Sequence, residues 1–76
     1  MPKMPRVTAR KLVRALRCAG YEPYRQVGSH LHLSCPASGR VVTVPIHGGV
    51  LAVGLVADII KQAGLTADEF RDLLDR

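Results

Sequence analysis

The chain has 76 residues, 47% of them hydrophobic, and a formal net charge of +5. This length allows one domain with one small core, residues 1–76, and the apolar fraction is typical of a folded protein rather than a disordered one. The longest uncharged stretch, residues 41–57, contains a proline, a histidine and three glycines, so no membrane-spanning segment is expected.

A helix is expected near the start of the chain. Residues 1–6 carry charge but no following apolar run, so no secretory leader is expected and the cytoplasm is the expected location. Thr8 suits the N-cap of the helix, apolar residues recur after it at helical spacing, and Gly20 is the expected stop.

Cys18 and Cys35 have no metal or redox spacing, and both are expected to be reduced, buried side chains.

Three strands are expected next, at residues 21–26, 30–35 and 40–46, with turn-forming residues between them. Pro23 suits an edge strand, because proline has no N–H to donate to a neighbouring strand. Short connections of this kind favour an antiparallel meander.

Two helices complete the chain. The first is expected over residues 54–63, with its buried side at positions 55, 56, 59, 60 and 63. Thr66 and Glu69 have capping-box spacing, which predicts a short final helix that carries Phe70, Leu73 and Leu74 onto the core. The order α-β-β-β-α-α indicates an α+β fold of the double-stranded-RNA-binding-domain type, with a three-stranded antiparallel sheet and helices on one face.

The histidines all fall within eighteen positions of the predicted sheet. If Leu31 and Leu33 face the helices, then His30 and His32 project from the opposite, open face of the sheet. The same alternation places His47, at the end of the third strand, on that face. Imidazole exchanges protons near neutral pH, so this face is the candidate site of chemistry.

The basic residues are concentrated in the first forty positions, where eight Lys and Arg residues face a single acid, Glu22. Such a surface suits a polyanionic partner, but charge alone is explained more simply by a solvated helix face, because basic patches are common on proteins that bind nothing anionic. Arg10, Arg14 and Arg25 are the candidate phosphate ligands, and Tyr24 is the candidate for stacking on a base.

Four segments follow one another in a characteristic order. They are Ala19-Gly20-Tyr21, Arg25-Gln26-Val27-Gly28-Ser29-His30, Val44-Pro45-Ile46-His47 and Ile59-Ile60-Lys61-Gln62-Ala63-Gly64-Leu65, and the last is followed by Glu69-Phe70. In this order the chain resembles the HicA mRNA interferase toxins of bacterial and archaeal toxin–antitoxin pairs, over nearly its whole length. One departure is Gly54-Leu55-Val56-Ala57, where family members often have Gly-Thr-Leu-Arg. The departure removes a hydroxyl and a cation from the start of that helix.

The resemblance implies a toxin of a type II toxin–antitoxin system that cleaves mRNA as a metal-independent endoribonuclease, with His30 as the catalytic residue. It implies that no cofactor is needed and that the partners are RNA and a HicB-like antitoxin. Because the candidate site lies on an open face, a toxic activity there has to be restrained by another chain, so the antitoxin is expected to cover the face bearing His30. Beside His30, Gly28 lets the backbone turn sharply near a phosphate and Ser29 offers a hydrogen-bond donor. His32 and His47 are secondary candidates for phosphate positioning or proton transfer.

Other interpretations remain open for the same residues. The chain could be an RNA-binding module of this fold without catalysis, or a metal-binding protein that uses His30, His32, Cys35 and His47, although their spacing is not typical of a zinc site. His32 could be a solvent-facing strand residue, and His47 could bond the backbone of the following loop.

Overall fold

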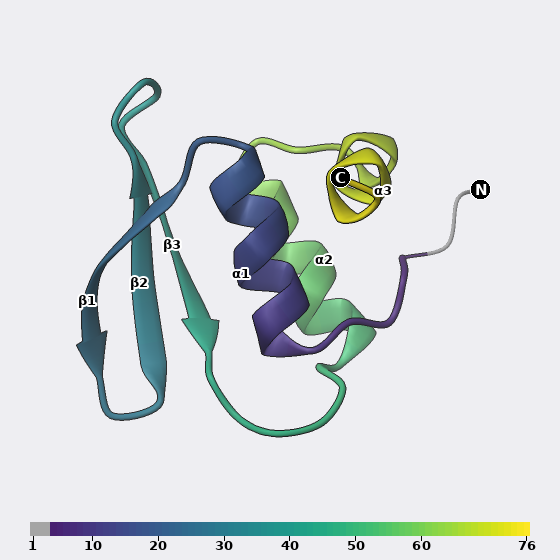
Figure 1. The fold of residues 1–76 in the computed structure, drawn as a ribbon, viewed down its shortest axis with the longest axis horizontal. Helices are drawn as coiled ribbons and strands as arrows, with labels where there is room; N and C mark the ends of the chain where they lie inside the picture. Colours follow the sequence, from purple (N-terminus) through teal and green to yellow (C-terminus); the bar gives the residue numbers. More distant parts are fainter. Residues whose placement is uncertain (1–3) are drawn as a thin grey trace.

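The computed structural model describes residues 4–76, and the expectation of no leader at residues 1–6 therefore lies partly outside the described residues. All three helices lie on one side of a three-stranded antiparallel sheet of order β1-β2-β3 (Figure 1). This arrangement confirms the predicted α+β fold. The elements are α1 (Ala9–Cys18), β1 (Glu22–Val27), β2 (His30–Cys35), β3 (Arg40–Pro45), α2 (Val53–Gln62) and α3 (Ala67–Leu74).

The core lies between the inner face of the sheet and the helices. Alternate residues of β2 and β3 point into it, including Leu33, Val42 and Val44, each at most 1% exposed. From the helical side, Leu12, Val56 and Phe70 are fully buried against them. The alternation confirms the sequence-based assignment of Leu33 to the inner face and of His30 and His32 to the outer one.

Tyr21 was expected to open the first strand, but β1 begins one residue later. The Tyr21 backbone N–H bonds the Leu16 carbonyl at the end of α1, and its hydroxyl donates to the carbonyl of Ala63 at 2.9 Å. With only 2% of its surface exposed, Tyr21 is a core residue that joins the ends of α1 and α2. The predicted edge strand is therefore confirmed as β1, but its start at Tyr21 was wrong by one residue, because the Tyr21 N–H bonds the end of α1.

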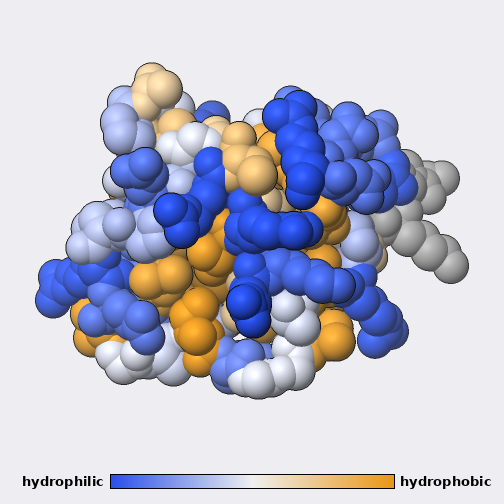
Figure 2. Space-filling model, in the orientation of Figure 1, coloured by the Kyte–Doolittle hydropathy of each residue, from blue (hydrophilic) through white to orange (hydrophobic). Residues whose placement is uncertain are grey.

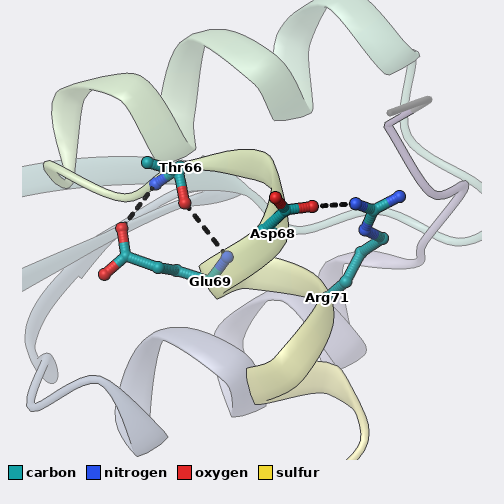
Figure 3. A network of polar contacts seen from close by, with 4 residues as sticks. All are labelled: Thr66, Asp68, Glu69 and Arg71. Atoms are coloured by element: carbon teal, nitrogen blue, oxygen red, sulfur yellow. Dashed lines mark hydrogen bonds and ion pairs between the residues drawn. The ribbon is translucent and has the colours of Figure 1, made fainter. Parts of the chain in front are cut away.

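The helix ends follow the predicted capping chemistry. Thr8 caps α1 by accepting from the Lys11 N–H. At α3, the Thr66 hydroxyl accepts from the Glu69 N–H at 3.1 Å and the Glu69 carboxylate accepts from the Thr66 N–H at 2.9 Å (Figure 3). An exposed ion pair between Asp68 and Arg71 lies on the same helix. The capping box was therefore predicted correctly.

Two predicted core positions are instead at the surface. Leu55 is 36% exposed, because it precedes the buried stripe of α2 at Val56 by one residue, a rotation of about 100° around the helix. Cys18 is exposed while Cys35 is buried. Cys18 follows Arg14 by four residues and so shares the polar stripe of α1, which makes the prediction of burial wrong for this cysteine.

The sheet extends beyond the helical layer on the β1 side (Figure 1). All six residues of β1 are exposed, and its register with β2 shifts between Pro23 and Arg25. β1 is thus accessible from both faces, whereas the inner face of β2 is covered. Within residues 4–76, no helix has the length and apolar character needed to cross a bilayer.

Candidate functional site

A two-residue turn between β1 and β2 positions His30. Gly28 takes a φ of +58°, the left-handed region that favours glycine and that tight hairpin turns of this length require. The Gln26 side-chain amide donates to the Gly28 carbonyl at 3.1 Å, and the Ser29 carbonyl accepts from the Ile46 N–H. The first bond supports the turn from within the hairpin, and the second attaches it to the end of β3.

The two histidines of β2 have different surroundings. The His32 ring is half-buried, with Nδ1 at 2.9 Å from the Thr43 hydroxyl on β3, and its centroid lies 6.2 Å from that of Tyr24. The His30 ring is exposed, and within residues 4–76 no hydrogen-bond partner holds it. His32 is therefore oriented by its neighbours, whereas both nitrogens of His30 are available to a substrate.

The outer face of the hairpin also carries a cation and an aromatic ring. Arg25 is paired in register with His32, and paired residues of antiparallel strands share a face. Tyr24 is 58% exposed beside His32. The structure therefore brings together four of the predicted site residues, His30, His32, Arg25 and Tyr24, on what we call the open face.

His47, Arg10 and Arg14 do not join this group. His47 lies beyond the end of β3 and lines a hollow on the helical side together with Leu31 and Arg10, so the prediction that three histidines share one face was wrong for His47. Its Nδ1 bonds the Gly48 carbonyl at 2.9 Å, which confirms the alternative of a loop-bonding histidine. Arg14 donates to the Leu74 carbonyl at the end of α3 at 2.9 Å.

A comparison with known protein families identifies the chain. The sequence model of one family, described as the HicA toxin of bacterial toxin–antitoxin systems, matches residues 9–65, from the first residue of α1 through the whole sheet and α2. The chain belongs to the HicA toxin family. This confirms the resemblance seen in the sequence, and it makes the protein a toxin whose family works in pairs with antitoxins of the HicB type. No curated protein matches the chain.

In this HicA toxin, the residues of the alternative metal site do not converge. Cys35 is buried on the inner face of the sheet, while His30 and His32 project from the outer face. Among residues 4–76, no three His, Cys, Asp or Glu residues are grouped as a metal ion requires. The hypothesis of a site built from His30, His32, Cys35 and His47 is therefore wrong.

The groups of the HicA toxin with shifted pKa values also lie on the helical side. Burial raises the pKa of the Tyr21 phenol, and the adjacent Cys35 adds to this effect. Hydrogen bonding from Ser38 lowers the pKa of the Cys35 thiol. Both shifts follow from packing within the core and its margin, not from the arrangement of the open face.

Two residues that orient the hairpin were not singled out from the sequence, Thr43 and Gln26. Thr43 fixes the His32 ring, and Gln26 supports the turn before His30. The strand register would have identified Thr43, because it lies directly opposite His32 in the β2–β3 ladder. Gln26 carries no comparable pattern, since its bond to the Gly28 carbonyl depends on the shape of the turn.

Proposed function

We propose that this HicA toxin is an endoribonuclease that cleaves mRNA without a metal ion, with His30 as a general acid or base. The observation that carries the proposal is the contrast on the open face, where the His32 ring is fixed by Thr43 and the exposed His30 ring is not. A proton-transfer group needs unobstructed contact with the substrate, and His30 has it. The cytoplasm, where mRNA is translated, is the proposed place of action.

Cleavage of RNA by this route requires two proton transfers. The ribose 2′-oxygen attacks the adjacent phosphorus and loses its proton, while the bond from phosphorus to the 5′-oxygen breaks and that oxygen gains one. Neutral imidazole can accept the first proton and imidazolium can supply the second. Arg25 offers positive charge to the phosphate beside His30, and Tyr24 with His32 offers an exposed ring surface to a base.

The decisive experiment compares the wild type with His30→Ala on single-stranded RNA in the presence of a chelator. We expect a rate loss of about 10²-fold or more, with an unchanged circular dichroism spectrum because the side chain is exposed. His47→Ala is the matched control and should cleave at nearly the wild-type rate. Dependence of cleavage on a metal ion, or full activity of folded His30→Ala, would contradict the proposal.

A modified substrate separates the two roles of His30. A 5′-bridging phosphorothiolate at the scissile bond gives a thiolate leaving group that needs no protonation. Rescue of His30→Ala by this substrate assigns His30 as the general acid, and an undiminished loss assigns it as the base. RNA binding by the wild type without any cleavage would instead support the alternative of a non-catalytic RNA-binding module.

We also propose that the HicB-like antitoxin covers the open face and so withholds His30 from RNA. Because His30 is exposed and has no hydrogen-bond partner among residues 4–76, it should react readily with diethyl pyrocarbonate in the free toxin. The antitoxin complex should protect it. Modification of His30 at equal rates in the free toxin and in the complex would contradict direct occlusion.

A further inference from the structure

A groove runs along α1 on the side away from the open face. Two hollows of about 520 and 570 Å³ lie next to each other along α1, because Arg10 and Val13 line both of them. Together they form what we call the α1 groove, with apolar Val13, Leu31 and Ile46 in its walls and Arg10, Arg14 and Arg17 along its length. Figure 2 shows apolar surface between strongly hydrophilic side chains over α1 and the neighbouring strands.

The groove exists because the hairpin extends past the helices. Leu31 and Ile46 face the helical side of the sheet, yet both remain only partly buried against the core. Val13 is likewise half-buried on the flank of α1. Three apolar side chains thus point into a hollow that no other element of residues 4–76 fills, a combination typical of a surface that binds a partner.

The charges along the groove are mostly unpaired. The single ion pair within residues 4–76 joins Arg71 to Asp68 on α3, so Arg10 and Arg17 have no carboxylate partner there. Glu22 is the one acid in the lining, at the end near Cys18. Three arginines against one glutamate make the groove a complement to carboxylates.

We propose that the α1 groove is the docking site of a segment of the antitoxin that carries apolar side chains flanked by acidic ones. The apolar side chains of the wall suit the aliphatic or aromatic anchors of a protein partner, and the arginines beside them can pair with its carboxylates. α1 has ten residues and so a length of about 15 Å, which an extended segment of roughly five residues would span. The proposal rests on the family's antitoxin partner and is independent of ribonuclease chemistry.

Cys18 provides a direct test, because it is exposed and lines the groove while Cys35 is buried. The probe is N-ethylmaleimide, applied to the free toxin and to its purified complex with a co-expressed HicB-type antitoxin. We expect alkylation of Cys18 to slow at least tenfold in the complex. Equal rates in the two samples would overturn the proposal, as would a failure of this antitoxin to bind at all.

Substitutions test the two kinds of contact separately, with antitoxin affinity measured by calorimetry. Val13→Asp and Arg10→Glu should each weaken binding at least tenfold. Their matched controls, Val53→Asp at the exposed start of α2 and Lys11→Glu on the outer side of α1, should stay within twofold of the wild type. Arg10→Glu changes an exposed side chain, so it remains informative if Val13→Asp does not fold. Equal weakening by the controls would overturn the proposal.

Other occupants of the α1 groove, RNA or a second copy of the toxin, would give different results in these experiments. If groove variants lose affinity for fluorescein-labelled RNA and keep it for the antitoxin, the groove belongs to RNA and the proposal is overturned. A dimer of the free toxin that Arg10→Glu dissociates would assign the groove to a second copy and overturn it as well. Antitoxin binding that depends on the groove in a toxin that cleaves no RNA would support the docking site and contradict the proposed ribonuclease function.

Discussion

The two faces of β2 differ strongly in their exposure to solvent. Leu33 on the inner face has no exposed surface, whereas His30 on the outer face is exposed. Inner residues belong to the same hydrophobic core as residues of α1, α2 and α3, and outer residues meet solvent and the side chains of β1 and β3. A single strand thus holds the core together on one side and presents reactive groups on the other, which lets the open face change without loss of the fold.

Substitution of adjacent residues on β2 should give the largest contrast. Leu33→Ala removes a fully buried side chain and should lower the free energy of unfolding by about 2–5 kcal/mol. His32→Ala removes a half-buried ring and its bond to Thr43, with an expected cost of about 1 kcal/mol. Chemical denaturation measures both. Similar losses would show that the open face contributes to stability as much as the core does.

Tyr21→Phe tests the buried hydrogen bond that joins the ends of α1 and α2 on the helical side of the sheet. The variant leaves the Ala63 carbonyl without its donor, and should lose about 1–3 kcal/mol of stability. Because burial raises the pKa of Tyr21, the folded state favours the neutral phenol, and this contribution is present below pH ~10 and lost as pH rises above it. Unfolding free energies measured from pH 8 to 11 should therefore fall less steeply in Tyr21→Phe, and parallel curves would refute the linkage.

Gly64→Ala probes the junction of α2 with the sheet. Gly64 has a φ of +76°, and a Cβ there would lie 3.1 Å from the Arg40 guanidinium, which donates to the Gln62 carbonyl. We expect a loss of about 1–2 kcal/mol from the left-handed backbone alone. Gly48→Ala is the control, because its φ is not positive and its Cβ would meet nothing within 4 Å. Equal melting temperatures for the two variants would contradict this account.

The sequence predicted the elements whose pattern is local. β2 was predicted at its observed bounds, because alternation of Leu31 and Leu33 with the histidines fixes its register. The capping box at Thr66 was equally reliable, since it depends on two residues three apart. The choice of His30 as the catalytic residue came from the family resemblance, and its exposure is what the structure adds.

The errors concern residues whose surroundings depend on how elements are arranged in space. The exposure of Cys18 and Leu55 follows from the rotation of each helix relative to the sheet, and His47 turned toward α1 because the chain leaves β3 at Pro45. The α1 groove could not be predicted from the sequence either, because the pattern around Val13 and Ile46 is that of ordinary core residues. Only the extension of the hairpin past the helices leaves them accessible.

The experiment with the smallest expected effect tests which face of the toxin binds RNA. In the inactive His30→Ala background, Arg25→Ala should reduce the slope of log affinity against log salt concentration by about 0.7, the value for one phosphate contact on a single strand. Arg10→Ala should change that slope by less, because Arg10 lies in the α1 groove and Arg25 lies beside His32 on the open face. Fluorescence anisotropy of labelled RNA between 50 and 300 mM salt measures both slopes. A larger change for Arg10→Ala than for Arg25→Ala would place the RNA against α1, and the open face would then lack the phosphate contact that its proposed chemistry requires.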